Sequence, residues 1–334
     1  MKLTIEEIAR KTGTSRSTVS RVLSGHPNVK EETRIHIKKI MEELDYRPNR
    51  LAQGLATGSI NIVGLIVGDI RNPYYSEITR AVETVLNEEG YMVVLCDSDY
   101  NPLKEEHFLR VAIEMGFASV IMTSAMETDE LKKILDNLHC PLILLNRQLE
   151  TIQTDVVSFD NFRGGYLVAE HLIKYGHKDI QVLAGPARSS SSNARFAGYK
   201  KALEDYGLNF SDANIAHGDL RLETGYEFGL KLLREKSRST AVIAGNDMMA
   251  IGLIQAFRDR GLRVPEDLSV VGFDDIPLAA MSAVKLTTIK QPQTEMGKQA
   301  AKLVLDRLNG ESKAPRLITY EPELILRDST RRIG

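Results

Sequence analysis

The sequence predicts a small all-α head containing a helix-turn-helix unit, followed by an α/β body of two lobes with parallel, doubly wound sheets. Three observations predict this fold. The first 50 residues carry short helical patterns, Pro48 closes that region, and β-rich runs alternate with amphipathic stretches over the rest of the 334 residues. We therefore divide the chain into a head (residues 1–48), a linker (49–60) and a body (61–334).

Composition and charge restrict the class of protein. With 43% apolar and 26% charged residues, disordered, collagen-like and coiled-coil chains are excluded. No apolar run approaches the roughly 20 residues that a membrane span needs, and the first residues do not form a signal peptide. The only cysteines, Cys96 and Cys140, cannot form a disulfide framework or a zinc cluster. We expect a cytoplasmic protein with no membrane partner, no metal and no cofactor.

The first two helices of the head are marked by their ends. Thr4-Ile5-Glu6-Glu7 has the form of a capping box, and Gly13 suits the end of the helix that follows. Either Thr14 or Ser15 is expected to cap a second helix, Arg16 to Leu23.

A third helix, from about Glu31 to Leu44, is expected after the turn at residues 24–28. Two short helices joined by a turn and braced by a third form a helix-turn-helix unit. The apolar residues expected to face inward on the third helix are Ile35, Ile37, Ile40, Met41 and Leu44.

In such a unit, the start of the second helix reads base edges in the major groove. Residues 1–50 hold eleven basic and seven acidic residues, a net charge of +4, whereas the rest of the chain is acidic; this asymmetry favours a polyanionic partner for the head. A three-helix bundle with no DNA partner is the alternative. The expected base contacts are Ser15, Arg16, Ser17 and Arg21, and the expected phosphate contacts are Thr18, Ser20, Arg34 and Tyr46.

The segment TIEEIARKTGTSRSTVSRVLSGHPNVKEETR, followed by YRPNRLAQGLATGS, resembles the N-terminus of the lactose/purine-repressor (LacI/GalR) family of bacterial transcription regulators. The similarity continues along essentially the whole chain. It implies a sequence-specific repressor that binds a near-palindromic double-stranded operator as a homodimer, and it adds Thr4, Asn28 and Asn49 to the DNA contacts. One departure is Lys30, where the family usually opens the third helix with Ser; this should weaken the cap by about 1 kcal/mol.

The linker is expected to form a marginal helix. Pro48 ends the head, and Asn49 can cap a short segment, Arg50 to Thr57, that Gly54 weakens. Such a segment orders only when paired and bound. The resemblance implies that two copies pair in the minor groove and that Leu55 is wedged between base pairs; a passive tether is the alternative.

The body alternates strands and helices, which predicts parallel sheets covered by helices on both faces. It resembles two-lobed periplasmic sugar-binding proteins, with an N-lobe of about 61–160 and 292–322 and a C-lobe of about 161–291 and 323–330. The expected strands are Ile62–Val67, Met92–Cys96, Ser119–Thr123, Leu142–Leu145 and Val156–Phe159, then Ile180–Leu183, Ala241–Ala244, Leu268–Phe273 and Leu286–Ile289. Helical stretches between them include Glu77–Glu88, Tyr166–Tyr175, Tyr199–Tyr206 and Met248–Arg260.

Ligands of such sheets bind beyond the carboxyl ends of the strands. Amide, carboxylate, guanidinium and aromatic side chains follow several of the expected strands and suit a hydroxyl-rich effector. Asp247 and Asp275 are expected instead to cap following helices, and a serine run is often a surface loop. The expected effector-binding residues are Asn72, Tyr74, Tyr75, Asn146, Arg147, Ser189, Ser191, Arg195, Leu220, Asn246, Asp274 and Gln291.

Two departures from the family bear on the ligand. Leu220 stands where sugar-binding relatives place an aromatic residue, so one stacking face is lost. Ribose-binding relatives carry Asp-Arg where this chain has Asn146-Arg147. Arg147 and Arg195 outnumber Asp274, a net charge of +1 that favours an anionic group, such as a sugar acid or a sugar phosphate.

Other functions are weighed against this one. The chain has no GxSxG, P-loop or GxGxxG motif, so we do not expect an enzyme. His171 and His177 are expected to be surface groups at a helix end. A catabolite-control-type regulator with a phosphorylated carrier protein as co-effector is the alternative, although such relatives lose the polar pocket. A dimer is expected because the segment Leu326–Gly334 is too polar for a heptad seam.

Overall fold

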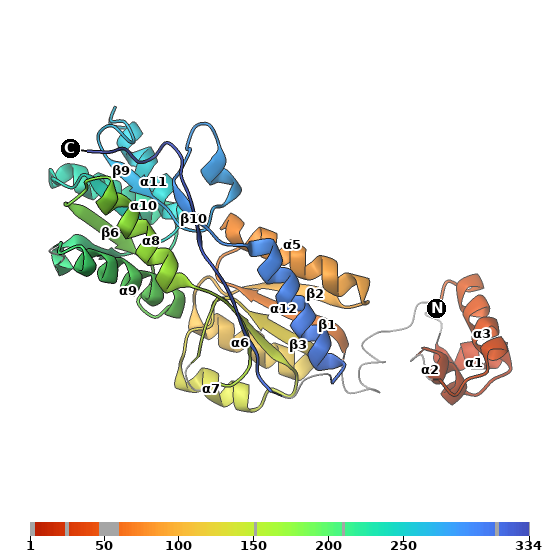
Figure 1. Cartoon of the computed structure of the whole chain (residues 1–334). Helices are drawn as coiled ribbons and strands as arrows, with labels where there is room; N and C mark the ends of the chain where they lie inside the picture. Colours follow the sequence, from red (N-terminus) through yellow and green to blue (C-terminus); the bar gives the residue numbers. More distant parts are fainter. Residues whose placement is uncertain are drawn as a thin grey trace. The chain divides into compact units, whose positions relative to one another are not determined.

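The computed structural model describes residues 4–23, 27–46, 60–149, 152–208, 211–310 and 314–333. The chain divides into two compact units, residues 1–61 and 62–334, and Figure 1 shows the helices and strands of each. As far as residue 46, the described part of the first unit is helical, and the second unit is α/β, which is the fold class that the sequence predicts. Asn49, Leu55 and the expected hinge segment 50–57 lie outside the described residues.

The head consists of α1 (Ile5–Thr12), α2 (Arg16–Leu23) and α3 (Glu31–Glu43). The capping box predicted for α1 is present, because the Glu7 amide donates to Thr4 Oγ1 at 3.3 Å and the Thr4 amide donates to Glu7 Oε2 at 2.8 Å. Lys30 makes no capping hydrogen bond with its side chain, as the departure from the family pattern predicts.

The interior of the head is formed by Ile8, Val19 and Ile37, which are fully buried. Burial of these side chains from all three helices holds the unit together. The expectation for Ile35 is wrong: its side chain is 59% exposed, because it lies on the opposite face of α3 from Ile37.

The N-lobe is built on a six-stranded sheet in the order β11-β5-β4-β3-β1-β2. The pairs β1–β2, β3–β4, β4–β5 and β5–β11 are parallel. The strands are β1 (Ile60–Val67), β2 (Met92–Asp97), β3 (Phe117–Met122), β4 (Leu142–Leu145), β5 (Asp155–Phe159) and β11 (Leu317–Tyr320). The helices of this lobe are α5 (Pro73–Glu88), α6 (Pro102–Met115), α7 (Asp129–Asp136) and α12 (Gln293–Leu308).

The C-lobe is built on a four-stranded parallel sheet in the order β7-β6-β8-β9. Its strands are β6 (Ile180–Ala184), β7 (Ile215–His217), β8 (Ala241–Ala244) and β9 (Ser269–Val271). Its helices are α8 (Asn161–Lys174), α9 (Ser190–Asp205), α10 (Leu222–Arg234) and α11 (Asp247–Arg258), with 3₁₀ turns at Asp212–Asn214 and Pro277–Ala280.

The last expected strand, Leu286–Ile289, does not simply extend the C-lobe sheet. The strand is β10 (Thr288–Lys290), and it pairs antiparallel with β12 (Glu323–Ile325) in a separate two-stranded sheet. Only isolated parallel bridges join this region to the end of β9. Both strands belong to chain segments that run between the lobes, visible in blue in Figure 1.

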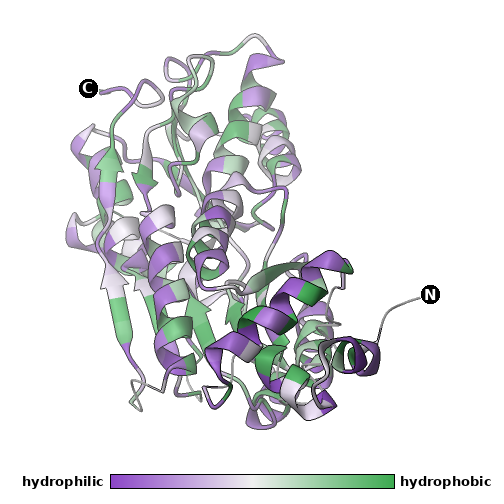
Figure 2. Ribbon diagram, turned by 90° about the vertical axis from the view of Figure 1, so that its right-hand side faces the viewer, coloured by the Kyte–Doolittle hydropathy of each residue, from purple (hydrophilic) through white to green (hydrophobic). Residues whose placement is uncertain are grey.

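Close helix packing in the C-lobe depends on glycine. A Cβ on Gly165 of α8 would lie 2.1 Å from the Arg195 carbonyl oxygen of α9, and one on Gly198 would lie 2.1 Å from the Phe162 carbonyl oxygen. The two glycines therefore allow these helices to approach until their backbones touch. This packing fixes the start of α8 relative to Arg195. In Figure 2 the strands are largely hydrophobic and the helices alternate hydrophobic with hydrophilic residues, as expected for helices that cover a sheet.

The expectation of surface positions for His171 and His177 is wrong. Both side chains are buried against the C-terminal segment of the chain. His171 Nε2 lies 3.0 Å from Thr330 Oγ1, and His177 Nε2 lies 3.1 Å from the Arg331 carbonyl oxygen.

Within the described ranges, no helix combines the length and the apolar character that crossing a bilayer requires. The same residues contain no group of three or more His, Cys, Asp or Glu side chains that could hold a metal ion.

Candidate functional site

The residues expected to read bases lie on the exposed face of α2. Ser15, Arg16, Ser17 and Arg21 are exposed, as is the expected phosphate contact Ser20, whereas Val19 and Val22 on the other face are buried. Arg16 is 70% exposed and makes an ion pair with Glu6 at 3.1 Å. A pair this exposed is worth little, so Arg16 can exchange Glu6 for another partner.

Ser15 has a structural role as well. The Thr18 amide donates to Ser15 Oγ at 3.1 Å, so Ser15 rather than Thr14 caps α2. Its hydroxyl also lies 2.7 Å from Ser17 Oγ and 2.8 Å from Thr18 Oγ1. These contacts orient three hydroxyl groups at the first turn of the helix.

The expected phosphate contacts are placed less uniformly. Arg34 is only 17% exposed and its Nε lies 3.3 Å from Glu31 Oε2. Tyr46 packs against the apolar interior of the head, and this burial raises the pKa of its hydroxyl. Thr4 belongs to the capping box, and Asn28 is exposed in the turn before α3.

In the body, predicted site residues from both lobes meet in one hydrogen-bonded chain. Tyr74 Oη donates to Gln291 Oε1 at 3.2 Å, and Asn146 Nδ2 donates to the same oxygen at 2.9 Å. Gln291 Nε2 then donates to Asp274 Oδ1 at 2.6 Å. The structure thus brings together side chains that are more than 200 residues apart in the sequence.

Arg195 is the buried cation of this cluster. Its Nε donates to Asn161 Oδ1 at 2.9 Å, and its Nη1 donates to the Gly245 carbonyl oxygen at 2.7 Å. Nη2 lies 3.6 Å from Asp274 Oδ1, and the guanidinium stacks on the Phe273 ring at 3.8 Å from its centroid. All these contacts fix its orientation before any ligand binds.

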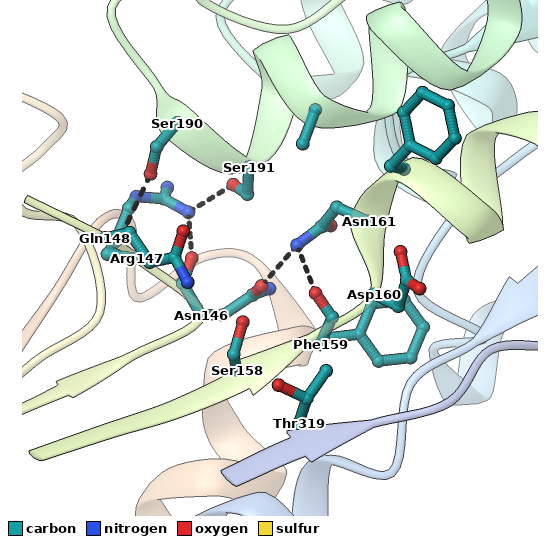
Figure 3. A pocket seen from close by; sticks show the side chains of 12 residues that line it. Asn146, Arg147, Gln148, Ser158, Phe159, Asp160, Asn161, Ser190, Ser191 and Thr319 are labelled. Carbon is teal, nitrogen blue, oxygen red and sulfur yellow. Dashed lines mark hydrogen bonds between the residues drawn. The ribbon is translucent and has the colours of Figure 1, made fainter. Parts of the chain in front are cut away.

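Arg147 reaches from the N-lobe to the start of α9. Its Nη1 donates to the Asn146 carbonyl oxygen at 2.8 Å and to Ser191 Oγ (Figure 3). Ser189 caps α9, since it accepts from the Ser192 amide at 3.3 Å, and its hydroxyl lies 3.1 Å from that of Ser191. The serine run is therefore an ordered helix start and not a surface loop.

The remaining predicted residues support this arrangement. Asn72 caps α5 by accepting from the Tyr74 amide at 3.0 Å. The Tyr75 hydroxyl lies 3.1 Å from that of Tyr100. Leu220 is buried and its carbonyl oxygen accepts from Asn246 Nδ2 at 2.9 Å.

Two expected caps are wrong. Asn246, and not Asp247, caps α11, because its Oδ1 accepts from the Met249 amide at 3.0 Å. Asp247 instead accepts from Thr288 Oγ1 at 2.5 Å and from the Ile276 amide at 2.9 Å. Asp275 makes an ion pair with Arg327 at 2.7 Å. Each carboxylate is directed away from the helix start by a partner on another chain segment.

Asn161 was not predicted and is central to the site. It donates from Nδ2 to Asn146 Oδ1 at 2.7 Å and accepts from Arg195, so it links the two lobes. Its position just after the strand Val156–Phe159 was the available signal. Tyr100 and Thr123, which also line the cluster, follow β2 and β3 in the same way.

Backbone strain is concentrated at this edge of the strands. Asn146, Leu220 and Asp274 have φ of 54°, 68° and 124°. Residues other than glycine rarely adopt positive φ, and such residues are often found at binding sites. The strain supports the interpretation that function, and not folding alone, dictates their placement.

The electrostatics of the cluster rest on two buried acids. Burial raises the pKa of Asp274, and the nearby guanidinium of Arg195 opposes this shift. Burial and the negative charge of Asp274 raise the pKa of Asp247. The cluster itself is lined by Arg147, Arg195 and the one carboxyl group of Asp274, so two guanidinium groups against one acid leave it with a positive balance.

The cleft is closed. The space left among these side chains is about 20 Å³, room for roughly one water molecule. At one edge, Arg221 of the C-lobe pairs with Asp69 at 3.3 Å and with Asp99 of the N-lobe. Burial alone would raise the pKa of Asp69, but hydrogen bonds and charge from Arg71 and Arg221 lower it. We call Arg221, Asp69 and Asp99 the latch.

The chain is similar to known proteins over its full length. Residues 4–49 match the family described as bacterial regulatory proteins, lacI family, and residues 169–330 match the periplasmic binding protein-like domain. Catabolite control protein A of Priestia megaterium is 35% identical over 332 residues, which cover 99% of this chain and 100% of that protein.

Two solved structures show the same likeness. The structure of the lac repressor dimer bound to operator and the anti-inducer ONPF matches with a TM-score of 0.84 and 27% identity, covering 99% of this chain and 100% of that one. The complex of the transcriptional regulator CelR with cellobiose matches with a TM-score of 0.74 and 30% identity, covering 98% and 99%.

Proposed function

The chain belongs to the lacI family of bacterial regulatory proteins, and from this premise we propose that it is a repressor whose operator affinity is controlled by a small effector bound between the lobes. The proposal rests on the presence of two features in one chain: an exposed, polar face on α2, and a buried polar cluster where strands of both lobes end. The first suits DNA and the second suits a hydroxylated ligand.

For the head, we infer a division of roles between arginines. Arg16 is exposed at the start of α2, where a guanidinium can donate two hydrogen bonds to guanine. Arg34 lies on α3 beside Glu31 and is expected to contact phosphate, which carries no sequence information. Ser15, Ser17 and Arg21 complete the proposed base contacts.

The test is a binding-site selection from random duplexes with wild type, Arg16→Ala and Arg34→Ala. Arg16→Ala should relax preference at particular base pairs, at a cost of about 1–3 kcal/mol each. Arg34→Ala should weaken binding to all sequences alike and keep the preference. Unchanged preferences in Arg16→Ala, in a protein whose helix content equals that of wild type, would refute the assignment of α2 as the reading helix.

For the effector, we propose a sugar acid or sugar phosphate. The lac repressor structure contains ONPF and the CelR structure contains cellobiose, which supports a carbohydrate-type ligand. Arg147 and Arg195 line the cluster with the single carboxyl group of Asp274, and this excess of positive charge favours an anionic group. Because the cleft holds only about 20 Å³, the ligand must enter through an open form.

A phosphorylated carrier protein as co-effector is the alternative, favoured by the likeness to catabolite control protein A. The polar cluster of Asn146, Arg195, Asn246 and Asp274 is complete in this chain, and it has no use in a regulator that responds to a carrier protein alone. We therefore place the small molecule first.

The proposal also includes a homodimer and a link between lobe closure and operator binding. The N-lobe exposes large apolar side chains near β2, an edge strand, and these suit a homodimer interface. They are Ile70, Met92, Leu95 and Leu103, which are 44–72% exposed. A near-palindromic operator then follows from two-fold symmetry. Closure of the lobes would set the spacing between the hinge segments, residues 50–57, of the two protomers. A ligand that binds the closed and the open lobes with different affinities would then shift operator affinity by that difference.

A further inference from the structure

An ion pair between two helices of the head places an acid beside the arginine that is expected to read bases. Glu6 lies in the first turn of α1, and Arg16 is the first residue of α2. Glu6 Oε1 lies 3.1 Å from Arg16 Nη1, and the two side chains are 65% and 70% exposed. A carboxylate is therefore held where the head is proposed to meet DNA.

Glu6 is not needed to cap α1. The capping box at the start of this helix is formed by Thr4 and Glu7. Glu6 is exposed, and the contact that the structure records for its carboxylate among the described residues is the one to Arg16. Its negative charge suits the start of a helix, as would that of any acid in the first turn. The distinguishing feature of Glu6 is therefore its ion pair with Arg16.

Close to DNA, a carboxylate on these helices reduces affinity. In a helix-turn-helix unit the first helix crosses the phosphate backbone while the second enters the major groove. Phosphates repel an acid placed there, and this repulsion weakens binding to every duplex alike. The charge of Glu6 by itself therefore gives no sequence preference. It only reduces the positive charge of the head, which totals +4 over residues 1–50.

The ion pair leaves one edge of the Arg16 guanidinium available. Glu6 engages Nη1, whereas Nε and Nη2 have no recorded partner among the residues that the structure describes. Those two nitrogens form one side of the planar group, and two parallel N–H bonds from one side suit O6 and N7 of guanine. Arg16 can thus contact a guanine while it remains paired with Glu6.

The same ion pair competes with the phosphates for Arg16. An exposed pair is weak, but a two-bond contact with guanine through the free edge leaves it intact. A guanidinium that turns instead to the DNA backbone gives up Glu6, and a phosphate contact carries no sequence information. Glu6 therefore disfavours the nonspecific use of Arg16 more than its specific use.

We propose that Glu6 is a positioning residue for base reading: it holds Arg16 so that the free edge of the guanidinium is presented to a guanine and kept from the phosphates. This inference rests on the proposed repressor function, and it names a residue that raises specificity while it lowers affinity. Loss of the carboxylate should therefore increase nonspecific binding and decrease base preference. Loss of a residue that merely supports the fold would decrease both.

The experiment uses the full chain and compares wild type, Glu6→Gln and Arg16→Ala by selection from random duplexes. The guanine positions that matter are those at which Arg16→Ala relaxes the preference. At these positions, Glu6→Gln should lose about three- to tenfold of the preference.

The affinity of the same proteins for a mixed-sequence duplex that was not selected is then measured over a range of salt concentrations. Glu6→Gln should bind this duplex about threefold or more tightly than wild type at low salt. The slope of log K against log salt should also steepen by about 1, because the released Arg16 contacts one more phosphate.

Glu43→Gln is the matched control for charge, because Glu43 is another exposed acid of the head and pairs with Lys39 of α3 at 3.9 Å. It should keep the wild-type base preference. In the Arg16→Ala background, Glu6→Gln should not change base preference further, since Glu6 acts through Arg16. All variants are compared at wild-type helix content.

The proposal is overturned if Glu6→Gln keeps the wild-type preference at those guanine positions or binds the unselected duplex no more tightly than wild type. It is also overturned if Arg16→Ala relaxes no guanine position, or if Glu43→Gln changes the preference as Glu6→Gln does. A wild-type chain that selects no sequence at all would give a different result, since it would refute the repressor assignment on which the inference rests.

Discussion

Burial of His171 and His177 favours their uncharged forms in the folded protein. Burial, with the charge of the neighbouring histidine second, lowers the pKa of His171 to about 4, and burial lowers the pKa of His177. Their rings lie against Thr330, Thr240 and the Arg331 carbonyl oxygen. Protonation would place an imidazolium charge among these hydroxyl and carbonyl partners, and the structure records no salt bridge to either ring in the residues that it describes.

This predicts a loss of stability in mild acid. An unfolded histidine titrates near pH 6.5. Between about pH 6.5 and pH 4 the unfolded chain therefore binds more protons than the folded chain, and the free energy of unfolding decreases as the pH is lowered. The contribution of His171 is intact above pH 6.5, and about 2 kcal/mol is lost by pH 5. Urea unfolding of the body at about pH 7.5 and 5 measures it.

His171→Gln is the informative variant, because glutamine can still reach Thr330 and does not titrate. Its unfolding free energy should change less between the two pH values than that of wild type. Lys174→Gln, an exposed position one turn later on α8, is the control and should keep the wild-type difference. Equal pH dependence in wild type and His171→Gln would contradict the assignment.

At the residue scale, the sequence located the site better than it assigned the role of each side chain. Every predicted effector residue lies in or beside one cluster, because strand ends of a parallel sheet meet at one edge. The cap of α11 was assigned to Asp247 and not to Asn246, because capping depends on which of two adjacent side chains Thr288 engages. Asn161 was missed because its partners, Asn146 and Arg195, come from distant segments.

Among the elements, α3 begins without a side-chain cap. Lys30 precedes it with backbone angles of a cap but no capping hydrogen bond from its side chain. A serine there can accept from the first-turn amides, so Lys30→Ser should stabilise α3 by about 1 kcal/mol. Hydrogen exchange of α3 amides in the full chain reports this local free energy.

Lys30→Ala is the control that distinguishes the effect of a new capping hydrogen bond from the effect of losing the Lys30 charge. It removes the same ammonium group without adding an acceptor. Exchange should slow in Lys30→Ser and stay near wild type in Lys30→Ala. If both variants slow exchange equally, the lost charge and not the cap is responsible.

The sequence pattern predicted which segments form helices and which form strands, but it did not predict which strands pair with each other. The run Leu286–Ile289 has the β-branched, buried character of a central strand, yet β10 pairs antiparallel with β12. Hydropathy periodicity reports whether a strand is buried, and it does not identify the neighbour that supplies hydrogen bonds. Ile35 shows the same limit in a helix: its apolar side chain lies on the exposed face of α3.

At the scale of the whole molecule, we expect the latch to set the balance between closed and open lobes. Arg221 joins the C-lobe to Asp69 and Asp99, and its side chain is 30% exposed. A partly exposed network of this kind is worth about 1 kcal/mol. Arg221→Ala should therefore shift the equilibrium roughly fivefold toward the open form, visible as a longer interlobe distance between spin labels.

Arg71→Ala is the matched control. Arg71 pairs with the same carboxylates, at 2.7 Å from Asp69 and 3.6 Å from Asp99, but from within the N-lobe. Its removal leaves both acids to Arg221 and should not open the cleft. Equal opening in the two variants would show that the charge of the acids, and not the bridge between lobes, governs closure.

The interleaving of the lobes has a consequence for synthesis on the ribosome. The N-lobe sheet needs β11, which is translated after the whole C-lobe sheet, and the C-lobe packs His171 and His177 against residues near 330. The head, complete by residue 46, can fold early, whereas β5 must wait some 150 residues for its partner strand. Until then its edge is unpaired, and nascent chains with exposed strand edges are prone to aggregate. We therefore expect the body of this protein, more than its head, to depend on chaperones during translation.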